Sequence, residues 1–151
     1  MQLPIEIYSD EYFMREALKE AQKAYDADEV PVGAVIVVGN KIIARGHNLT
    51  ERLKDVTAHA EMQSITSAAN AIGGKYLHEC CIYVTLEPCV MCSGALAWSQ
   101  IDKVVYGASD DKRGFSQIQT KLMHAKTKIV SNVLAQECES LLKQFFALKR
   151  K

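Results

Sequence analysis

Three side chains that can bind a metal ion, together with one carboxylate, stand in two short motifs, His59-Ala60-Glu61 and Pro88-Cys89-Val90-Met91-Cys92. Imidazole nitrogen and thiolate sulfur are ligands that Zn²⁺ prefers in tetrahedral sites. A structural zinc site fills all four positions with protein ligands, whereas a catalytic site leaves one position for water. Because His59, Cys89 and Cys92 supply three ligands, their number predicts an open, catalytic zinc site.

The spacing of these residues indicates where helices must begin. Cys89 and Cys92 are three residues apart, so they share one face of a helix. His59 and Glu61 are two residues apart and would point to different sides in the middle of a helix. They can converge only where a helix begins. We therefore expect two helices whose first turns meet at the metal ion, with Thr57 as the cap of the first.

Glu61 is not needed as a ligand, and its carboxylate suits a proton shuttle beside an activated water molecule. The alternative is a closed structural site that takes its fourth ligand from elsewhere in the chain. A second C-x-x-C or an H-x-x-H motif would favour that alternative, and the sequence contains neither. The side chains that could supply a fourth ligand are Cys80, Cys81, His47, His78, His124 and Cys138.

The composition is typical of a globular protein, with 48% hydrophobic residues, 24% charged residues and a formal net charge of zero. We expect a single domain that spans residues 1–151. No apolar run is long enough to span a membrane, and two of the five cysteines are assigned to the metal. These features indicate a cytoplasmic protein with reduced thiols.

The charges are distributed unevenly along the chain. Residues 1–29 carry eight acidic and three basic residues, whereas residues 112–151 carry nine basic and two acidic residues. Such asymmetry permits a phosphate-binding face on a neutral protein. Two solvated helix faces of opposite charge would explain the pattern equally well.

Apolar periodicity predicts the elements that must position the two motifs. Gly39-Asn40 predicts a tight hairpin, and the order strand, helix, strand over residues 81–106 predicts a crossover between parallel strands. Residues 107–127 are predicted to form a long functional or mobile loop. The predicted helices cover residues 10–27, 59–73, 89–99 and 134–149, and the predicted strands cover residues 32–38, 41–46, 81–86 and 103–106.

The chain resembles the bacterial tRNA-specific adenosine deaminases. Four segments carry this resemblance most specifically: residues 30–34, 57–61, 83–92 and 105–108. The pairing of H-x-E with P-C-x-x-C is the signature of zinc-dependent nucleobase deaminases. The resemblance runs from about Tyr12 to Arg150. It implies a cytidine deaminase-like α/β fold, in which a three-layer α/β/α sandwich surrounds a five-stranded mixed sheet. It also implies one Zn²⁺ per chain and a homodimer.

The resemblance further implies which residues surround the target base. Asn48 should hydrogen-bond the base. Val30, Ala60 and the backbone of Leu86 and Glu87 should line the pocket. Without the resemblance, Asn48 would be interpreted as a turn residue.

A second group of residues is expected to contact the RNA around the base. Asp110 should lie near the ribose of a flanking nucleotide. Phe145 and Phe146 match a pair of aromatic residues in the last helix, and the basic residues that follow them, here Lys149 and Arg150, should lie near the RNA. From the residues alone, core packing would be the preferred interpretation of the two aromatic rings.

The implied activity is the hydrolytic deamination of the wobble adenosine of tRNA to inosine, and the implied partner is the anticodon loop. Glu61 would take a proton from a water molecule activated by zinc and return it to the base. Ala97-Trp98 and Gly114-Phe115 resemble the guanine deaminase branch of the superfamily. A deaminase that acts on a small free base or nucleoside, such as guanine or cytosine, is therefore the alternative.

Overall fold

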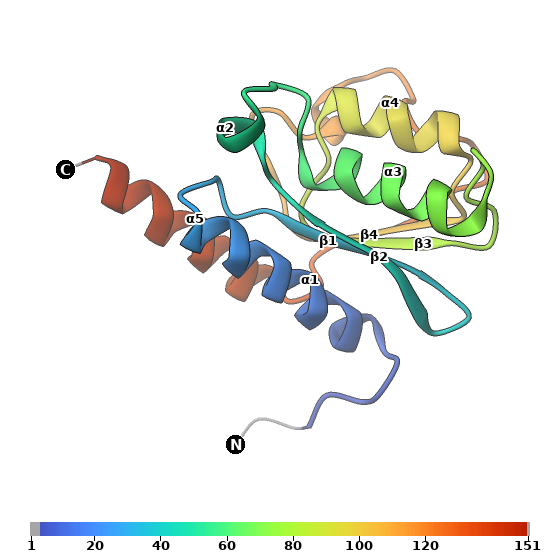
Figure 1. The fold of residues 1–151 in the computed structure, drawn as a ribbon, viewed down its shortest axis with the longest axis horizontal. Helices are drawn as coiled ribbons and strands as arrows, with labels where there is room; N and C mark the ends of the chain where they lie inside the picture. Colours follow the sequence, from blue (N-terminus) through green and yellow to red (C-terminus); the bar gives the residue numbers. More distant parts are fainter. Residues whose placement is uncertain (1–3, 151) are drawn as a thin grey trace.

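The computed structural model describes residues 4–150 and contains a five-stranded mixed sheet with helices on both faces (Figure 1). The helices are α1 (Asp10–Asp26), α2 (Thr50–Leu53), α3 (Ala60–Ile72), α4 (Val90–Ser99) and α5 (Ala135–Lys149), and a short 3₁₀ helix, η1, covers Phe115–Gln117. The strands are β1 (Gly33–Val38), β2 (Lys41–His47), β3 (Cys81–Leu86), β4 (Lys103–Ala108) and β5 (Lys128–Val130).

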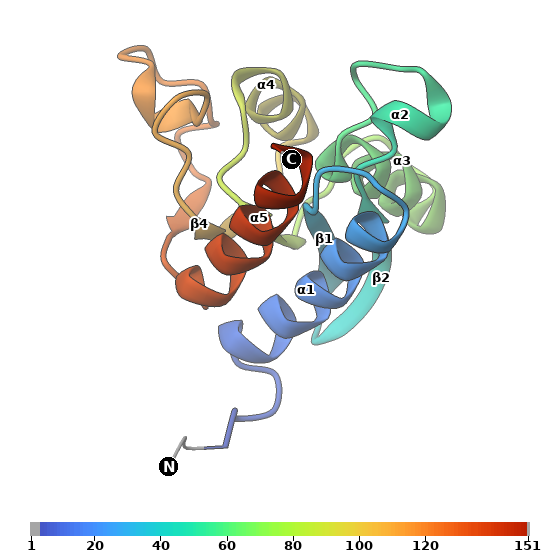
Figure 2. The ribbon, with the colours of Figure 1, turned by 90° about the vertical axis from the view of Figure 1, so that its left-hand side faces the viewer.

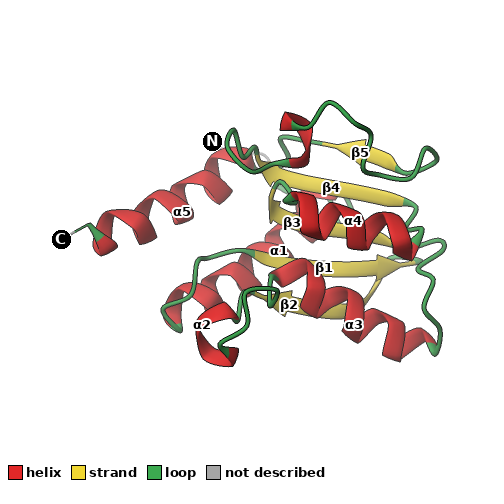
Figure 3. Ribbon diagram, turned by 90° about the horizontal axis from the view of Figure 1, so that it is seen from above, coloured by secondary structure: helices red, strands yellow, loops and turns green. Residues whose placement is uncertain are grey.

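The strands follow the order β2-β1-β3-β4-β5 across the sheet (Figure 3). β1 pairs antiparallel with both β2 and β3, whereas β3, β4 and β5 are parallel to one another. The parallel pairing of β3 with β4 across α4 confirms the predicted crossover. Gly39 and Asn40 both have positive φ angles, 53° and 63°, which a tight two-residue hairpin requires.

The helices form two layers on opposite faces of the sheet, and Figure 2 shows these layers from the side. Helices α1 and α5 pack on one face, where Phe13, Val35 and Val105 belong to one hydrophobic cluster. Helices α3 and α4 pack on the other face, in a second cluster that includes Ile82 and Leu96. The three-layer sandwich implied by the resemblance is therefore confirmed. None of the helices described within residues 4–150 is long and apolar enough to cross a membrane.

Small residues let α3 lie close to the sheet on the side that bears the metal-binding motifs. A Cβ atom at Gly46 of β2 would stand 2.6 Å from Ser64 Oγ and 2.8 Å from the carbonyl oxygen of Ala60. Because nothing larger than glycine fits at this position, the start of α3 is held at a fixed distance from β2.

The short helix α2 was not predicted from the sequence. Its first backbone N–H groups are bound by the carboxylate of Glu29, which accepts hydrogen bonds from Glu51 at 3.0 Å and Arg52 at 2.8 Å. The Glu29 side chain is buried, so it acts as a helix cap supplied from a distant part of the chain.

The prediction that Thr57 caps the metal-binding helix was wrong. The Thr57 hydroxyl instead donates to Asp55 at 2.7 Å, and His59 itself occupies the N-cap position of α3. The predicted long loop is also partly ordered, because β4 continues to Ala108 and η1 lies within it. The strand β5 then follows directly.

Candidate metal centre and its surroundings

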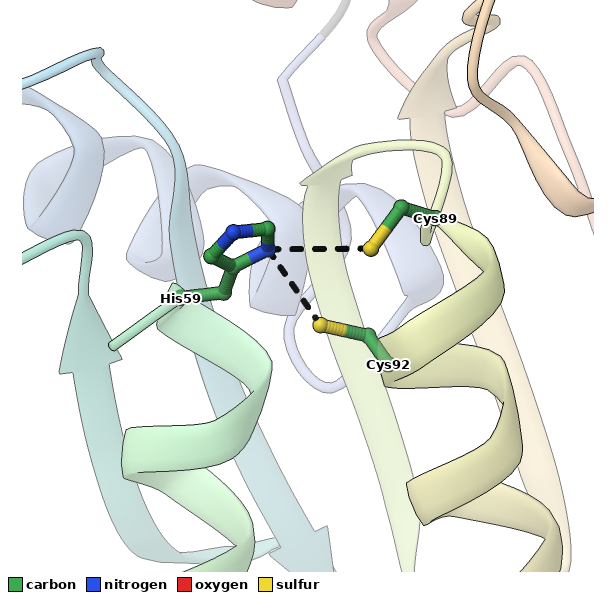
Figure 4. Close-up of side chains that lie close together, drawn as sticks. All are labelled: His59, Cys89 and Cys92. Atoms are coloured by element: carbon green, nitrogen blue, oxygen red, sulfur yellow. Dashed lines mark hydrogen bonds between the residues drawn. The ribbon is translucent and has the colours of Figure 1, made fainter. Parts of the chain in front are cut away.

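His59, Cys89 and Cys92 point toward one another at the ends of two helices (Figure 4). The Nδ1 atom of His59 lies 3.7 Å from Cys89 Sγ and 3.5 Å from Cys92 Sγ. A tetrahedral zinc ion with ordinary zinc–nitrogen and zinc–sulfur bonds requires a nitrogen–sulfur separation of about 3.6 Å. The three side chains therefore already have the spacing that zinc requires.

Two helices position these ligands. His59 is the N-cap residue of α3, Cys89 is the N-cap residue of α4, and Cys92 lies in the first turn of α4. The positive ends of both helix dipoles favour thiolates at this position. The prediction that two helices begin at the metal site is confirmed.

The metal-binding group consists of three protein ligands, and the described residues supply no fourth ligand to it. Within residues 4–150, His59, Cys89 and Cys92 are the one set of His, Cys, Asp and Glu side chains whose ligand atoms lie within 4.8 Å of one another. The six other histidines and cysteines considered above are not part of this set, and neither is Glu61. This arrangement fits a metal ion with one coordination position available to a small molecule.

Hydrogen bonds inside the group favour a charged sulfur at Cys89. Bonds from Cys92 and His59 lower the pKa of the Cys89 thiol to about 4. The bond to Cys89, together with burial, raises the pKa of Cys92. The bond with Cys89 also raises the pKa of His59. A bound zinc ion would replace these shared protons, because thiolates and neutral imidazole are the forms that bind metal.

Glu61 lies beside the metal-binding group without belonging to it. Its side chain is in the first turn of α3 and is only 4% exposed. The pKa of the Glu61 carboxyl group is raised to about 7, mainly by burial and to a smaller extent by the nearby charge of Cys89, whereas hydrogen bonds with its own backbone N–H and with Cys92 act in the opposite direction. A carboxyl group with a pKa near neutrality can accept a proton and return it in one catalytic cycle.

The residues expected around the base come from several parts of the chain, and one of them, Asn48, contacts the helix that begins at the metal group. The Oδ1 atom of Asn48 accepts a hydrogen bond from the backbone N–H of Ala60 at 2.8 Å, so Asn48 holds the beginning of α3. Ala60 is fully buried, whereas Val30 and Leu86 are half-buried. The side chain of Glu87 is 2% exposed. It points toward the segment that follows β4, as described next.

Asp110 is linked to the metal-bearing turn through Glu87. The two carboxylate oxygens of Glu87 accept hydrogen bonds from the backbone N–H of Asp110 at 3.0 Å and of Ser116 at 2.9 Å. The Asp110 carboxylate in turn accepts the N–H groups of Lys112 and Arg113. The family resemblance implies only a backbone role for Glu87, because no local pattern connects its side chain to residues more than twenty positions away.

A cavity of about 330 Å³ lies farther along the same segment. Residues between Phe115 and Ile129 line it, and none of the expected site residues is among them. This cavity is therefore separate from the metal centre.

The end of α5 reaches the loop between α1 and β1. Phe145 is 6% exposed and packs edge to face against Tyr25, so its ring belongs to the interior, whereas Phe146 is 42% exposed. Lys149 Nζ lies 2.5 Å from Asp28 Oδ1, two residues before Val30. Figures 1 and 3 show α5 running past the sheet on the side where α3 and α4 begin.

Two basic residues therefore stand at the end of α5 on that side, Lys149 in its last turn and the exposed Arg150 after it. Lys151, the basic residue that follows Arg150, lies outside the described residues. Of the aromatic pair that the resemblance placed near RNA, Phe146 is the residue whose ring is exposed.

Known proteins resemble this chain in sequence and in fold. Residues 7–108 match the model of the family described as the cytidine and deoxycytidylate deaminase zinc-binding region. Over 147 residues the chain is 46% identical to the tRNA-specific adenosine deaminase of Bacillus subtilis (strain 168), covering 94% of this chain and 91% of that protein. It is 45% identical over 141 residues to the tRNA-specific adenosine deaminase of Aquifex aeolicus (strain VF5), covering 90% and 93%.

Structural comparison gives the same assignment. A solved structure from studies of A-to-I editing by tRNA:A34 deaminases at the wobble position of transfer RNA superimposes with a TM-score of 0.81. Its sequence is 39% identical, and the match covers 86% of this chain and 98% of that chain. The site formed by His59, Cys89 and Cys92 is accordingly a zinc site. The chain belongs to the zinc-dependent cytidine and deoxycytidylate deaminase family, and within it to the tRNA-specific adenosine deaminases.

Proposed function

We propose that this protein is an aminohydrolase that converts adenosine to inosine at the wobble position of tRNA, releasing ammonia. The observation that carries the proposal is the pairing of an open three-ligand zinc site with the buried carboxyl group of Glu61. The relatives supply the substrate, because those with 45% and 46% identity are named for the deamination of adenosine in tRNA.

Each residue of the site has a defined task in this reaction. His59, Cys89 and Cys92 would hold the zinc ion, which when bound would supply the Lewis acid that activates water for attack on C6 of the adenine ring. Glu61 accepts a proton from the attacking water, delivers it to the ring nitrogen, and then assists the departure of ammonia. Asn48 hydrogen-bonds the base beside the first turn of α3. Val30, Ala60, Leu86 and the backbone of Glu87 form the walls around it.

The target adenosine must leave its stack to reach a buried carboxyl group. A base in a single-stranded loop is easier to unstack than a paired base, so an anticodon loop is a better substrate than a duplex. Asp110, Phe146, Lys149 and Arg150 are the residues that we assign to the surrounding nucleotides. In this proposal Lys149 and Arg150 bind phosphates, and the ring of Phe146, which is exposed, stacks on a base.

The proposal extends to the assembly and to the compartment. We propose that residues 1–151 form one deaminase domain and that two copies form a homodimer in the cytoplasm. An exposed apolar surface on α4 supports the dimer, because Trp98 is 84% exposed and Val90 and Met91 are also exposed. Sedimentation of the parent protein beside Trp98→Glu tests this point, and an unchanged dimer in the variant would place the interface elsewhere.

A parallel assay on several substrates tests the proposed activity. Inosine formation is measured on an anticodon stem–loop that carries the wobble adenosine, beside ammonia release from free adenosine, guanine and cytosine. The proposal requires inosine in the RNA and at least about 100-fold lower activity on the free compounds, which lack the phosphate and flanking-base contacts. Efficient turnover of guanine or cytosine without editing of the RNA would establish the alternative function.

A further inference from the structure

The buried carboxylate of Glu87 forms hydrogen bonds with the backbone of one loop, residues 109–116. It follows β3 directly and precedes Pro88 and the zinc ligand Cys89. Its oxygens accept the backbone N–H of Asp110 at 3.0 Å and of Ser116 at 2.9 Å. Burying a carboxylate is unfavourable unless hydrogen bonds replace its water. The two bonds therefore stabilise both the carboxylate and the position of the loop.

The loop formed by residues 109–116 also contacts the zinc-bearing turn directly. Gly114 forms an isolated antiparallel bridge with Cys89. The backbone N–H of Phe115 donates to the carbonyl oxygen of Pro88 at 3.0 Å. The ring of Phe115 packs edge to face against Tyr106 of β4, with ring centres 6.0 Å apart. Polar contacts thus hold the loop against Glu87, Pro88 and Cys89, and an apolar contact holds it against β4.

Gly114 supplies the space that the carboxylate occupies. The three atoms nearest to a Cβ atom at this position would all belong to the carboxyl group of Glu87, and all would be in steric conflict with it. The φ angle of Gly114 is −63°, which any residue can adopt. Glycine is needed here for room and not for its backbone freedom.

We propose that Glu87 is a positioning residue, which fixes loop 109–116 against the zinc-bearing turn and so presents Asp110 to the substrate at a constant place beside the metal. Glu87 does not touch the reacting atoms in this account. Its effect on substrate binding rests on the proposed function, whereas its effect on the loop does not. Removing it should loosen the loop, weaken the binding of the RNA, and leave the chemistry at the metal unchanged.

The rate of trypsin cleavage reports how firmly the loop is held in the zinc-loaded protein, and this measurement does not depend on enzymatic activity. Lys112 and Arg113 are exposed, and both lie between the two residues that Glu87 binds. In Glu87→Gln one acceptor oxygen becomes an NH₂ group, which faces a backbone donor and loses one bond. Cleavage after Lys112 and Arg113, followed by mass spectrometry, should accelerate about 10-fold. The zinc content should stay at the parent level.

A second substitution reaches the same contact from the other side. Gly114→Ala should displace the Glu87 carboxylate and produce the same faster cleavage. In the double variant Glu87→Ala/Gly114→Ala the new methyl group has room, so its added effect should largely disappear. Gly74→Ala is the matched control, because nothing lies within 4 Å of a Cβ atom at that position. Additive effects of the two substitutions would contradict the proposed contact.

Steady-state kinetics on the anticodon stem–loop distinguish positioning from general stability. Glu87→Gln should raise KM about 10-fold and change kcat less than about twofold, because only a fraction of the molecules would present the loop correctly. Unchanged trypsin cleavage, an unchanged KM, or loss of zinc would each overturn the proposal. If the parent protein edits no RNA, the proposed function fails, and the trypsin experiment still decides whether Glu87 holds the loop.

Discussion

The side-chain oxygen of Asn48 and the backbone N–H of Ala60 form a 2.8 Å hydrogen bond that joins the end of β2 to the beginning of α3. Ala60 lies between the zinc ligand His59 and Glu61, so this bond sets the position of both. Within residues 4–150 no hydrogen bond engages the amide hydrogens of Asn48, which leaves them free to bind a substrate base. The side chain of Asn48 can therefore accept a hydrogen bond from α3 with its oxygen and donate one to a substrate base with its nitrogen.

Two substitutions of Asn48 should separate these roles. Asn48→Asp keeps an acceptor for the Ala60 N–H and loses the donor, so its thermal stability should stay near that of the parent. Its kcat/KM for RNA should fall about 10- to 100-fold. Asn48→Ala loses both groups and should also lose about 1 kcal/mol of stability. Thermal unfolding and editing assays test both variants, and full activity of Asn48→Asp would show that the amide does not read the base.

Glu61→Gln should keep the zinc ion and the fold but lose about 10²- to 10⁴-fold in kcat, because the amide cannot transfer the proton. Zinc content by atomic emission and inosine formation in single-turnover assays provide the measurement. Zinc loss in this variant would mean that the carboxylate is a ligand, contrary to the separation of Glu61 from the metal group.

The raised pKa of Glu61 predicts a pH-dependent stability of the metal-free protein. Burial raises the pKa from 4.5 to about 7 in the folded state, so the folded state binds this proton more tightly than the unfolded state. Stability is therefore lost as the pH rises from about 4.5 to 7. Metal-free Glu61→Gln should exceed the metal-free parent by about 1–3 kcal/mol at pH 8 and by much less at pH 5. A difference that does not vary with pH in urea unfolding would contradict this prediction.

Cys89→Ser should lose zinc and, with it, part of the stability that metal binding contributes to the fold. Cys81→Ser is the matched control, because Cys81 is also half-buried but lies outside the metal group. Zinc content and the melting temperature before and after chelation measure the effect. We expect the chelator to lower the melting temperature of the parent and of Cys81→Ser but not that of Cys89→Ser. A zinc-loaded Cys89→Ser protein with parent stability would remove Cys89 from the ligand set.

Replacing both Lys149 and Arg150 by Ala should weaken RNA binding and reduce its salt dependence. If each of these two basic side chains contacts one phosphate, the slope of the logarithm of the RNA-binding constant against the logarithm of the salt concentration should decrease by about 1.4 in magnitude. Lys143→Ala is the control, because it removes a basic residue of the same helix that we do not assign to the RNA. Fluorescence anisotropy at several salt concentrations provides the slopes. An unchanged slope would place the RNA on another face of the protein.

The metal ligands could be predicted from the sequence because their geometry is local. Cys89 and Cys92 share a turn of one helix, and the two-residue spacing of His59 and Glu61 fits the beginning of another. The crossover that connects β3 to β4 follows from general rules of chain connection. Within each motif the inference needs only residues that are close together in the chain, and the family signature pairs the two motifs, whose ligands His59 and Cys89 are 30 residues apart.

Contacts between distant segments account for what the sequence did not reveal. The cap of α2 comes from Glu29, more than twenty residues earlier, and the partners of Glu87 lie more than twenty residues later. The uneven charge distribution suggested separate faces, yet Lys149 and Asp28 bring the basic and acidic segments into direct contact. For Phe145, helical periodicity and the family resemblance gave different roles, and its burial against Tyr25 matches the periodicity.

The contact between Lys149 and Asp28 also determines how the protein should be tagged or tethered. A fusion partner attached behind Lys149 would stand beside the loop that carries Val30, where we propose that the substrate enters. Helix α1 is 17 residues long, so its opposite end lies about 25 Å away along the helix axis. A label or immobilisation anchor placed before Asp10 would therefore keep that entrance unobstructed, and an anchor behind Lys149 would compete with the nucleic acid for the same space.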